Sequence, residues 1–114
     1  MRVIVCGSRY WTDVEKIADR LSKLPGDTQI ITGGANGADR IAYDVANWMC
    51  LGTLEIRADW AKHGKSAGPI RNRQMLDWKP SLVIAFHSDF EHSKGTKDIV
   101  FEANKREIAV ELIG

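Results

Sequence analysis

Apolar residues along this chain follow two alternating patterns. Short apolar runs, typical of buried strands, alternate with longer segments in which apolar residues recur every three or four positions, as on one face of a helix. The predicted strands are Arg2–Cys6, Gln29–Thr32, Thr53–Arg57, Ser81–Phe86 and Ile108–Ile113. The predicted helices are Val14–Leu24, Ile41–Met49, Ile70–Trp78 and Thr96–Arg106.

Residues that start or stop helices mark the boundaries between these segments. Asp13 is a predicted N-cap of the first helix, and Pro25-Gly26 stops it. Gly52 is predicted to end the second helix, and Pro69 suits the first turn of the third. The polar segments between Asp59 and Pro69 and from His87 to Lys94 are predicted to be loops.

Strands that alternate with helices through short connections indicate an α/β fold. Right-handed crossovers then give a mostly parallel sheet of about five strands between two layers of helices, in one domain spanning residues 1–114. In such folds ligands bind outside the carboxyl ends of the strands. Those ends are predicted at Gly7-Ser8-Arg9, at Gly33-Gly34, after Arg57, and in the loop from His87 to Gly95.

Composition limits the classes of function. Sixteen Lys and Arg residues against fifteen Asp and Glu residues give a formal net charge of +1, so any anion site must be a local concentration of charge. Cys6 and Cys50 have no metal-ligand spacing and are predicted to be reduced and buried. The start is too short for a signal-peptide core and no apolar run nears a membrane span, which predicts a cytoplasmic protein without a membrane partner.

The segment Ile30–Asp39 carries the first candidate site. A short strand leads into Gly33-Gly34-Ala35-Asn36-Gly37, and a helix follows at once. Glycines let a backbone approach a ligand closely, and the start of a helix offers free N–H groups to phosphate. Asp39 either complements the helix dipole or contacts the ligand. Because its charge would repel phosphate, its predicted ligand partner is a ribose hydroxyl or a base.

Two standard nucleotide motifs do not fit. The dinucleotide fingerprint needs glycine where Thr32 stands, although Asp59 lies about twenty residues beyond the turn and could meet a ribose. Gly64-Lys65-Ser66 imitates the end of a P-loop, but Asp59 occupies the place of its first glycine, and no strand leads into it. A Walker-type NTPase is therefore rejected.

A basic cluster and a second hydroxyl-containing turn complete the predicted rim. Arg73 is the favoured anion-binding residue of Arg71-Asn72-Arg73, whereas a solvated basic face is accepted for Arg71 alone. Ser93-Lys94-Gly95-Thr96 is a second predicted phosphate cradle, or else a helix start capped by Ser93 or Thr96.

The remaining histidines and tryptophans add little. The three histidines lack metal spacing, so the sequence points to no metal and no cofactor. Trp11 and Trp60 lie in predicted rim loops and are the two tryptophans that could stack on a base.

Four ordered motifs resemble a known family. They are Val3-Ile4-Val5-Cys6-Gly7-Ser8-Arg9, Thr32-Gly33-Gly34-Ala35-Asn36-Gly37-Ala38-Asp39, Lys62-His63-Gly64-Lys65-Ser66-Ala67-Gly68-Pro69-Ile70-Arg71-Asn72-Arg73 and Ser93-Lys94-Gly95-Thr96. Together they resemble the small stand-alone domains of the SLOG superfamily, in the YspA/YpsA-related group that is also called DUF2493, common in bacteria and phages. The resemblance covers nearly the whole chain. It implies a Rossmann-like fold that binds nucleotides or nucleotide-derived ligands, often as a homo-oligomer.

The chain departs from the phosphoribohydrolases of that superfamily. Of their motif P-G-G-x-G-T-x-x-E only Gly95-Thr96 is present, and Ile99 stands in the place of the catalytic Glu. Arg73 corresponds to their active-site arginine. Cleavage of an N-glycosidic bond needs a carboxylate near the ribose, and the candidates are Asp39, Asp59 and Asp98. Asp98 is expected to point away from the position of the missing Glu.

The leading hypothesis is a module that binds a nucleotide or nucleotide-derived signal, as a sensor or to sequester it. Two alternatives stay open: a nucleoside monophosphate N-glycosidase with Arg73 and Asp39 or Asp98 as candidate catalytic residues, and single-stranded DNA binding through an R-N-R triplet that resembles the one in DprA proteins. The predicted ligand-binding residues are Gly7, Ser8, Arg9, Gly33, Gly34, Asn36, Gly37, Asp39, Lys65, Arg71, Asn72, Arg73, Lys94, Gly95 and Thr96.

Overall fold

Alternating side chains along the central strand bury the sheet on both faces. In the computed structural model, which describes all residues 1–114, Val3 and Val5 pack on one face and Ile4 and Cys6 on the other. The strands are Arg2–Gly7 (β1), Gln29–Thr32 (β2), Gly52–Glu55 (β3), Leu82–Phe86 (β4) and Ala109–Ile113 (β5). Because both faces are apolar, each must be covered by helices.

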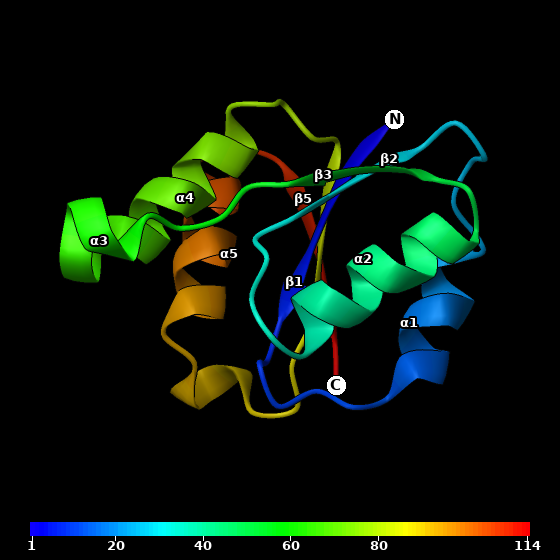
Figure 1. The fold of residues 1–114 in the computed structure, drawn as a ribbon, viewed down its shortest axis with the longest axis horizontal. Coiled ribbons are helices and arrows are strands. Elements are labelled where there is room, and N and C mark those ends of the chain that lie inside the picture. The colour runs from blue at the N-terminus through cyan, green and yellow to red at the C-terminus, as the bar shows by residue number, and fades with distance from the viewer.

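Five helices and two short 3₁₀ turns connect the strands. The helices are Val14–Leu21 (α1), Ala38–Trp48 (α2), Trp60–His63 (α3), Ala67–Leu76 (α4) and Gly95–Lys105 (α5), and the 3₁₀ turns are Gly64–Ser66 (η1) and Phe90–His92 (η2). Figure 1 shows α1 and α2 on one side of the sheet and α3, α4 and α5 on the other.

The sheet has the strand order β3-β2-β1-β4-β5, and every pair is parallel. This confirms the predicted α/β fold, a Rossmann-like sheet between two helical layers. The chain leaves β1 toward β2 on one side and later returns to place β4 on the other side of β1. The carboxyl ends of β1 and β4 therefore flank the crevice where such folds bind ligands. No helix of the structure is both long and apolar enough to cross a membrane.

Several predicted boundaries shift. The third main helix begins at Ala67 rather than Ile70, and the loop predicted before it contains α3, which Asp59 caps through its carboxylate and the Lys62 amide (3.1 Å). Apolar spacing could not reveal α3, because none of its four residues is buried. Asp13 is confirmed as the N-cap of α1, since its carboxylate accepts a hydrogen bond from the Lys16 amide at 3.1 Å.

The end of α2 corrects two expectations. Gly52 does not end the helix but begins β3, and α2 ends at Trp48. The reversal instead occurs at Cys50, which is exposed and has a φ of 61°, in the place where glycine is usual. The prediction that Cys50 is buried is therefore wrong, because the helix stops one turn before the glycine that was expected to stop it.

Trp11 is not available for stacking on a ligand. It is 9% exposed, its ring lies 5.5 Å from that of Phe86, and its Nε1 donates to the Asp13 carbonyl at 2.9 Å. The predicted rim tryptophan is instead part of the core between β4 and α1. Trp60 is 61% exposed, but it lies at the start of α3 rather than in the predicted loop.

Gly37 closes the turn before α2 against the loop after β1. Its φ is 75°, and the Ala38 amide donates to the Ser8 carbonyl at 3.0 Å. A Cβ at Gly37 would collide with the backbone of Ser8 and Arg9. Only glycine meets both the left-handed conformation and this close approach.

We expect Gly37→Ala to lower the free energy of unfolding by about 3 kcal/mol, because strain and overpacking add. Urea denaturation measures the loss. Gly26→Ala is the matched control, since a Cβ there meets nothing within 4 Å, and it should stay within about 0.5 kcal/mol of the wild type. Equal stability of the two variants would contradict the close approach at Gly37.

Candidate functional site

Hydrogen bonds join the predicted loops at the carboxyl edge of the sheet. The Ser8 amide donates to the Phe86 carbonyl at 2.9 Å, which ties the end of β1 to the end of β4. The Ser8 carbonyl accepts from Ala38, which brings the start of α2 to the same point. Gly7, Ser8 and Gly37 are therefore neighbours, as the sequence predicts from the shared carboxyl edge.

Asp39 fills the inner side of the glycine turn. It is 5% exposed, and its Oδ2 accepts hydrogen bonds from the amides of Gly33 (3.0 Å) and Ala35 (3.4 Å). Two of the N–H groups that the sequence offers to phosphate are thus used by a carboxylate of the chain. The sequence predicts Asp39 near the start of the helix, but it does not predict that its carboxylate accepts hydrogen bonds from the preceding glycine turn.

The environment of Asp39 works against its charge. Burial raises the pKa of Asp39 from 3.8 to about 6, and the charge of Glu55 acts in the same direction. The Arg71 guanidinium and the two amide hydrogen bonds lower the pKa, but they do not cancel the loss of hydration. Burial also raises the pKa of the nearby Cys6 thiol, so this thiol stays protonated at neutral pH.

Arg71 rather than Arg73 lies against the glycine turn. Its Nη1 donates to the Gly33 carbonyl, and its Nε donates to Asn72 Oδ1 at 3.0 Å. The expectation of a solvated basic face for Arg71 is therefore wrong. A single helix presents residues two apart in different directions, and the sequence could not say which of the two arginines faces the turn.

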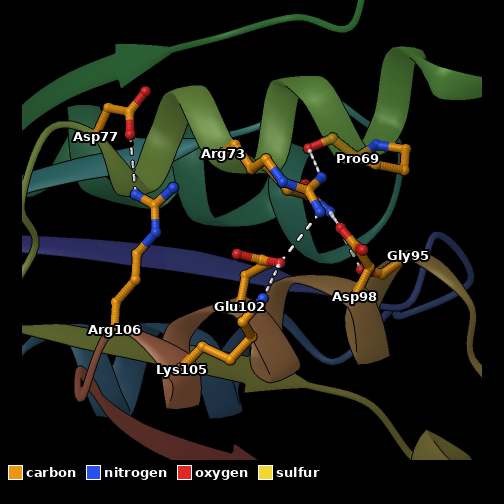
Figure 2. Close-up of polar contacts among 9 residues, drawn as sticks. Pro69, Arg73, Asp77, Gly95, Asp98, Glu102, Lys105 and Arg106 are labelled. Carbon is orange, nitrogen blue, oxygen red and sulfur yellow. Dashed lines mark hydrogen bonds and ion pairs between the residues drawn. The ribbon is translucent and has the colours of Figure 1, made fainter.

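Arg73 instead joins α4 to α5, as Figure 2 shows. Its Nη2 lies 3.1 Å from Glu102 Oε1, and its Nη1 donates to the Pro69 carbonyl at 3.0 Å. Lys105 Nζ is 3.6 Å from the same Glu102 oxygen. Arg73 is therefore paired with a carboxylate that is only 8% exposed, and anion binding by Arg73 stays a prediction.

Glu102 is the residue that sequence reasoning missed. It lies three positions after Ile99 and next to Ala103, both buried in the core. A carboxylate on the apolar stripe of a helix signals a buried partner, because an unpaired buried charge is costly. That signal was available in the sequence, but the partner could be identified only from the packing of α4 on α5.

Asn72 connects the two helices at the same edge. It is 4% exposed, and its Nδ2 donates to Asp98 Oδ2 at 2.9 Å and to the Gly95 carbonyl at 3.4 Å (Figure 2). Asp98 thus faces α4, whereas Ile99, in the place of the missing Glu, is 1% exposed in the core. All three residues of the Arg71-Asn72-Arg73 triplet are engaged within the protein.

The start of α5 has no side-chain cap. Lys94 is the N-cap and its side chain makes no capping bond, while the Ser93 hydroxyl donates to the Phe90 carbonyl at 2.9 Å. Capping by Ser93 or Thr96 is therefore wrong. Thr96 is 6% exposed, and an added Cβ on Gly95 would meet nothing within 4 Å. The first turn of α5 is thus left with free N–H groups next to open space.

Three predicted basic residues at or near the edge carry no ion pair. Arg9, Lys65 and Lys94 are exposed and belong to none of the salt bridges of the structure. The Arg9 guanidinium lies 5.1 Å from the centre of the Tyr10 ring. Asn36 is also exposed, at the tip of the glycine turn. These side chains remain available to an anion.

Two surface hollows lie elsewhere. One of about 470 Å³ is lined by Met1, Arg2, Asp27, Gln29, Lys79 and Ser81. The other, of about 370 Å³, is lined by Leu76, Asp77, Lys79, Pro80, Arg106 and Ile108. Neither contains a predicted site residue, and residues that precede β1, β2 and β4 place them at the amino edge.

Comparisons with known proteins agree with this architecture. Residues 1–63 match the model of a family described as the YspA, cpYpsA-related SLOG family. The chain is 36% identical to the Gene 61 protein of Mycobacterium phage D29, over 96% of this chain and 93% of that protein.

A solved structure of the DNA processing protein A (DprA) from Streptococcus pneumoniae matches 99% of this chain with a TM-score of 0.73 and 19% identity. The chain spans 50% of the length of that DprA chain. At this level of identity the likeness concerns the fold.

We expect Asp39 to make stability fall as pH rises from about 4 to about 7. The native pKa of about 6 exceeds the unfolded value of 3.8, so the native state binds the extra proton in this window, and its loss costs up to about 3 kcal/mol. Urea denaturation at several pH values should show the wild type losing stability relative to Asp39→Asn. If the difference in unfolding free energy between the two proteins stays constant with pH, or favours the wild type at pH 7, then Arg71 and the amides lower the pKa of Asp39 by at least as much as burial raises it.

Proposed function

The chain belongs to the YspA, cpYpsA-related SLOG family, and we propose that it binds a nucleotide or nucleotide-derived ligand at the carboxyl edge of its sheet. Such a domain would sense or sequester the ligand rather than transform it. The similarity to a protein of a mycobacterial phage supports a phage origin for the chain. In a phage, such a domain would serve to sequester a signalling nucleotide of the host.

The observation that carries this proposal is the uncapped start of α5. Three features meet there: free N–H groups in the first turn, the unpaired Lys94, and the Thr96 hydroxyl, which has no hydrogen-bond partner and is not sealed from solvent. Thr96 lies on the same stripe of α5 as Ile99 and Ala103, which face the sheet. A hydroxyl that solvent can reach and that has no partner within the protein is free to donate to a ligand. Phosphate is the natural ligand of such a helix start.

The rest of the ligand would extend from α5 toward the glycine turn. Asn72 contacts Gly95 while its neighbour Arg71 contacts Gly33, so the two turns are connected by adjacent residues of α4. Arg9 and Asn36 provide further polar contacts on the α2 side. A nucleoside monophosphate placed with its phosphate on α5 would bring its sugar toward the turn.

The two alternatives receive less support. An N-glycosidase would need Arg73 and a carboxylate at one reacting centre, yet Arg73 pairs with Glu102 while Asp39 lies against the glycine turn. DNA binding through the Arg71-Asn72-Arg73 triplet would need free guanidinium groups, and both arginines donate to groups of the protein. A steep dependence of binding on salt would nevertheless revive the DNA alternative.

We expect Thr96→Val to weaken nucleotide binding about tenfold without loss of stability, because one hydrogen bond to a charged group is removed and none inside the protein is broken. Isothermal calorimetry against nucleoside monophosphates, ADP-ribose forms and cyclic dinucleotides measures the binding. Thr28→Val is the control, since the Thr28 hydroxyl also has no partner within the protein, but it is fully buried. It lies at the amino edge before β2 and should leave binding unchanged.

Lys94→Ala is expected to weaken binding further, and Lys23→Ala serves as its control because Lys23 is an exposed lysine just beyond the end of α1. Absence of binding by the wild type across the whole panel would overturn the proposed function. Equal losses in Thr96→Val and Thr28→Val would overturn the assignment of phosphate to α5.

A further inference from the structure

The inner side of the Gly33–Gly37 turn is filled by side chains of the protein. Asp39 Oδ2 accepts hydrogen bonds from the amides of Gly33 and Ala35, and the Arg71 guanidinium donates to the Gly33 carbonyl. A Cβ on Gly33 would meet the Arg71 guanidinium and, at 2.9 Å, Asp39 Oδ2. The carboxylate thus occupies the position that a phosphate takes in an open glycine turn of this kind.

A phosphate could enter this turn only against the charge of Asp39. Both groups are anionic at neutral pH, and their repulsion is strong because Asp39 is 95% removed from water. The carboxylate is also covalently held, so it competes for the two amides without losing translational freedom. The turn therefore disfavours phosphate even though its backbone resembles a phosphate cradle.

The second carboxylate oxygen of Asp39 remains free. Oδ1 makes no hydrogen bond and is not sealed from solvent, whereas Oδ2 makes two. An ionised carboxylate only accepts hydrogen bonds, so its partner must be a donor. Among the parts of a nucleotide, the ribose hydroxyls and the N–H groups of the bases donate, and the ribose is the part that directly follows the phosphate. With the phosphate at the start of α5, a sugar that lacks the hydroxyl leaves this oxygen without a partner.

We propose that Asp39 closes the glycine turn to phosphate and accepts a hydrogen bond from a ribose hydroxyl, so that the site takes ribonucleotides in preference to deoxyribonucleotides. This inference rests on the proposed function and adds the sugar class of the ligand. In this proposal the two glycine-containing segments bind different parts of the ligand. The start of α5 binds the phosphate, and Asp39 at the turn after β2 accepts a hydrogen bond from the sugar.

The exclusion of phosphate is tested with inorganic phosphate and amide chemical shifts from ¹H–¹⁵N NMR. In the wild type, phosphate should shift the amides of Gly95 and Thr96 and leave those of Gly33 and Ala35 unchanged. In Asp39→Ala the vacated amides of Gly33 and Ala35 should shift as well. Asp44→Ala, which removes an exposed carboxylate from the same helix, should behave as the wild type.

Asp39→Asn provides a second variant if Asp39→Ala does not fold, because its amide oxygen can still accept from Gly33 and Ala35. Phosphate should reach these amides at higher concentration than in Asp39→Ala, because the Asn side chain still competes for them but no longer repels the anion. Phosphate-induced shifts of Gly33 and Ala35 in the wild type would overturn the exclusion. Their absence in every folded Asp39 variant would overturn it as well.

The choice of sugar is tested in the wild type by calorimetry with the four ribonucleoside 5′-monophosphates and their 2′-deoxy and 3′-deoxy forms. At least one deoxy series should bind about tenfold or more weakly, which is the loss expected for one hydrogen bond to a charged group. Equal affinities would overturn the inference while leaving the proposed function intact. No binding by any nucleotide would overturn both.

Discussion

The contact of Asp39 with the amides of Gly33 and Ala35 is the interaction on which the candidate site depends. It sets the shape of the turn after β2, and it brings a buried negative charge beside Arg71, which reaches across from α4. Arg71 also donates a hydrogen bond to Asn72, and Asn72 donates one to the Gly95 carbonyl, so a chain of hydrogen bonds reaches the start of α5. Elements on both faces of the sheet are thereby joined at one edge.

This arrangement separates structural polar groups from available ones. Arg71, Asn72, Arg73 and Glu102 have partners within the protein, so their hydrogen bonds and the Arg73–Glu102 ion pair stabilise the packing of α4 against the turn and α5. Arg9, Lys94 and the Thr96 hydroxyl have no such partners. The residues with partners within the protein maintain the fold, while the residues without such partners are the ones that can contact a ligand.

Burial explains why the charged residues of the edge behave differently. Arg73 is partly exposed and retains a nearly buried partner, which makes the pair a tether between helices. Asp39 is surrounded by protein and has its charge opposed by desolvation, yet Arg71 and two amides favour that charge. A carboxylate in this balance is sensitive to any group that enters the turn, which makes it suited to discriminate between ligands.

The sequence by itself determined the α/β fold, the alternation of strands and helices that makes the sheet parallel, and the edge where the glycine turns meet. It could do so because apolar periodicity and glycine positions are local properties of the chain. It also indicated the family through four motifs that lie in those turns. Only the tertiary structure decided that Arg71 rather than Arg73 faces Gly33, that Trp11 is buried, and that Glu102 pairs across the α4–α5 contact. These outcomes depend on how helices rotate against one another, and residues distant in sequence set that rotation.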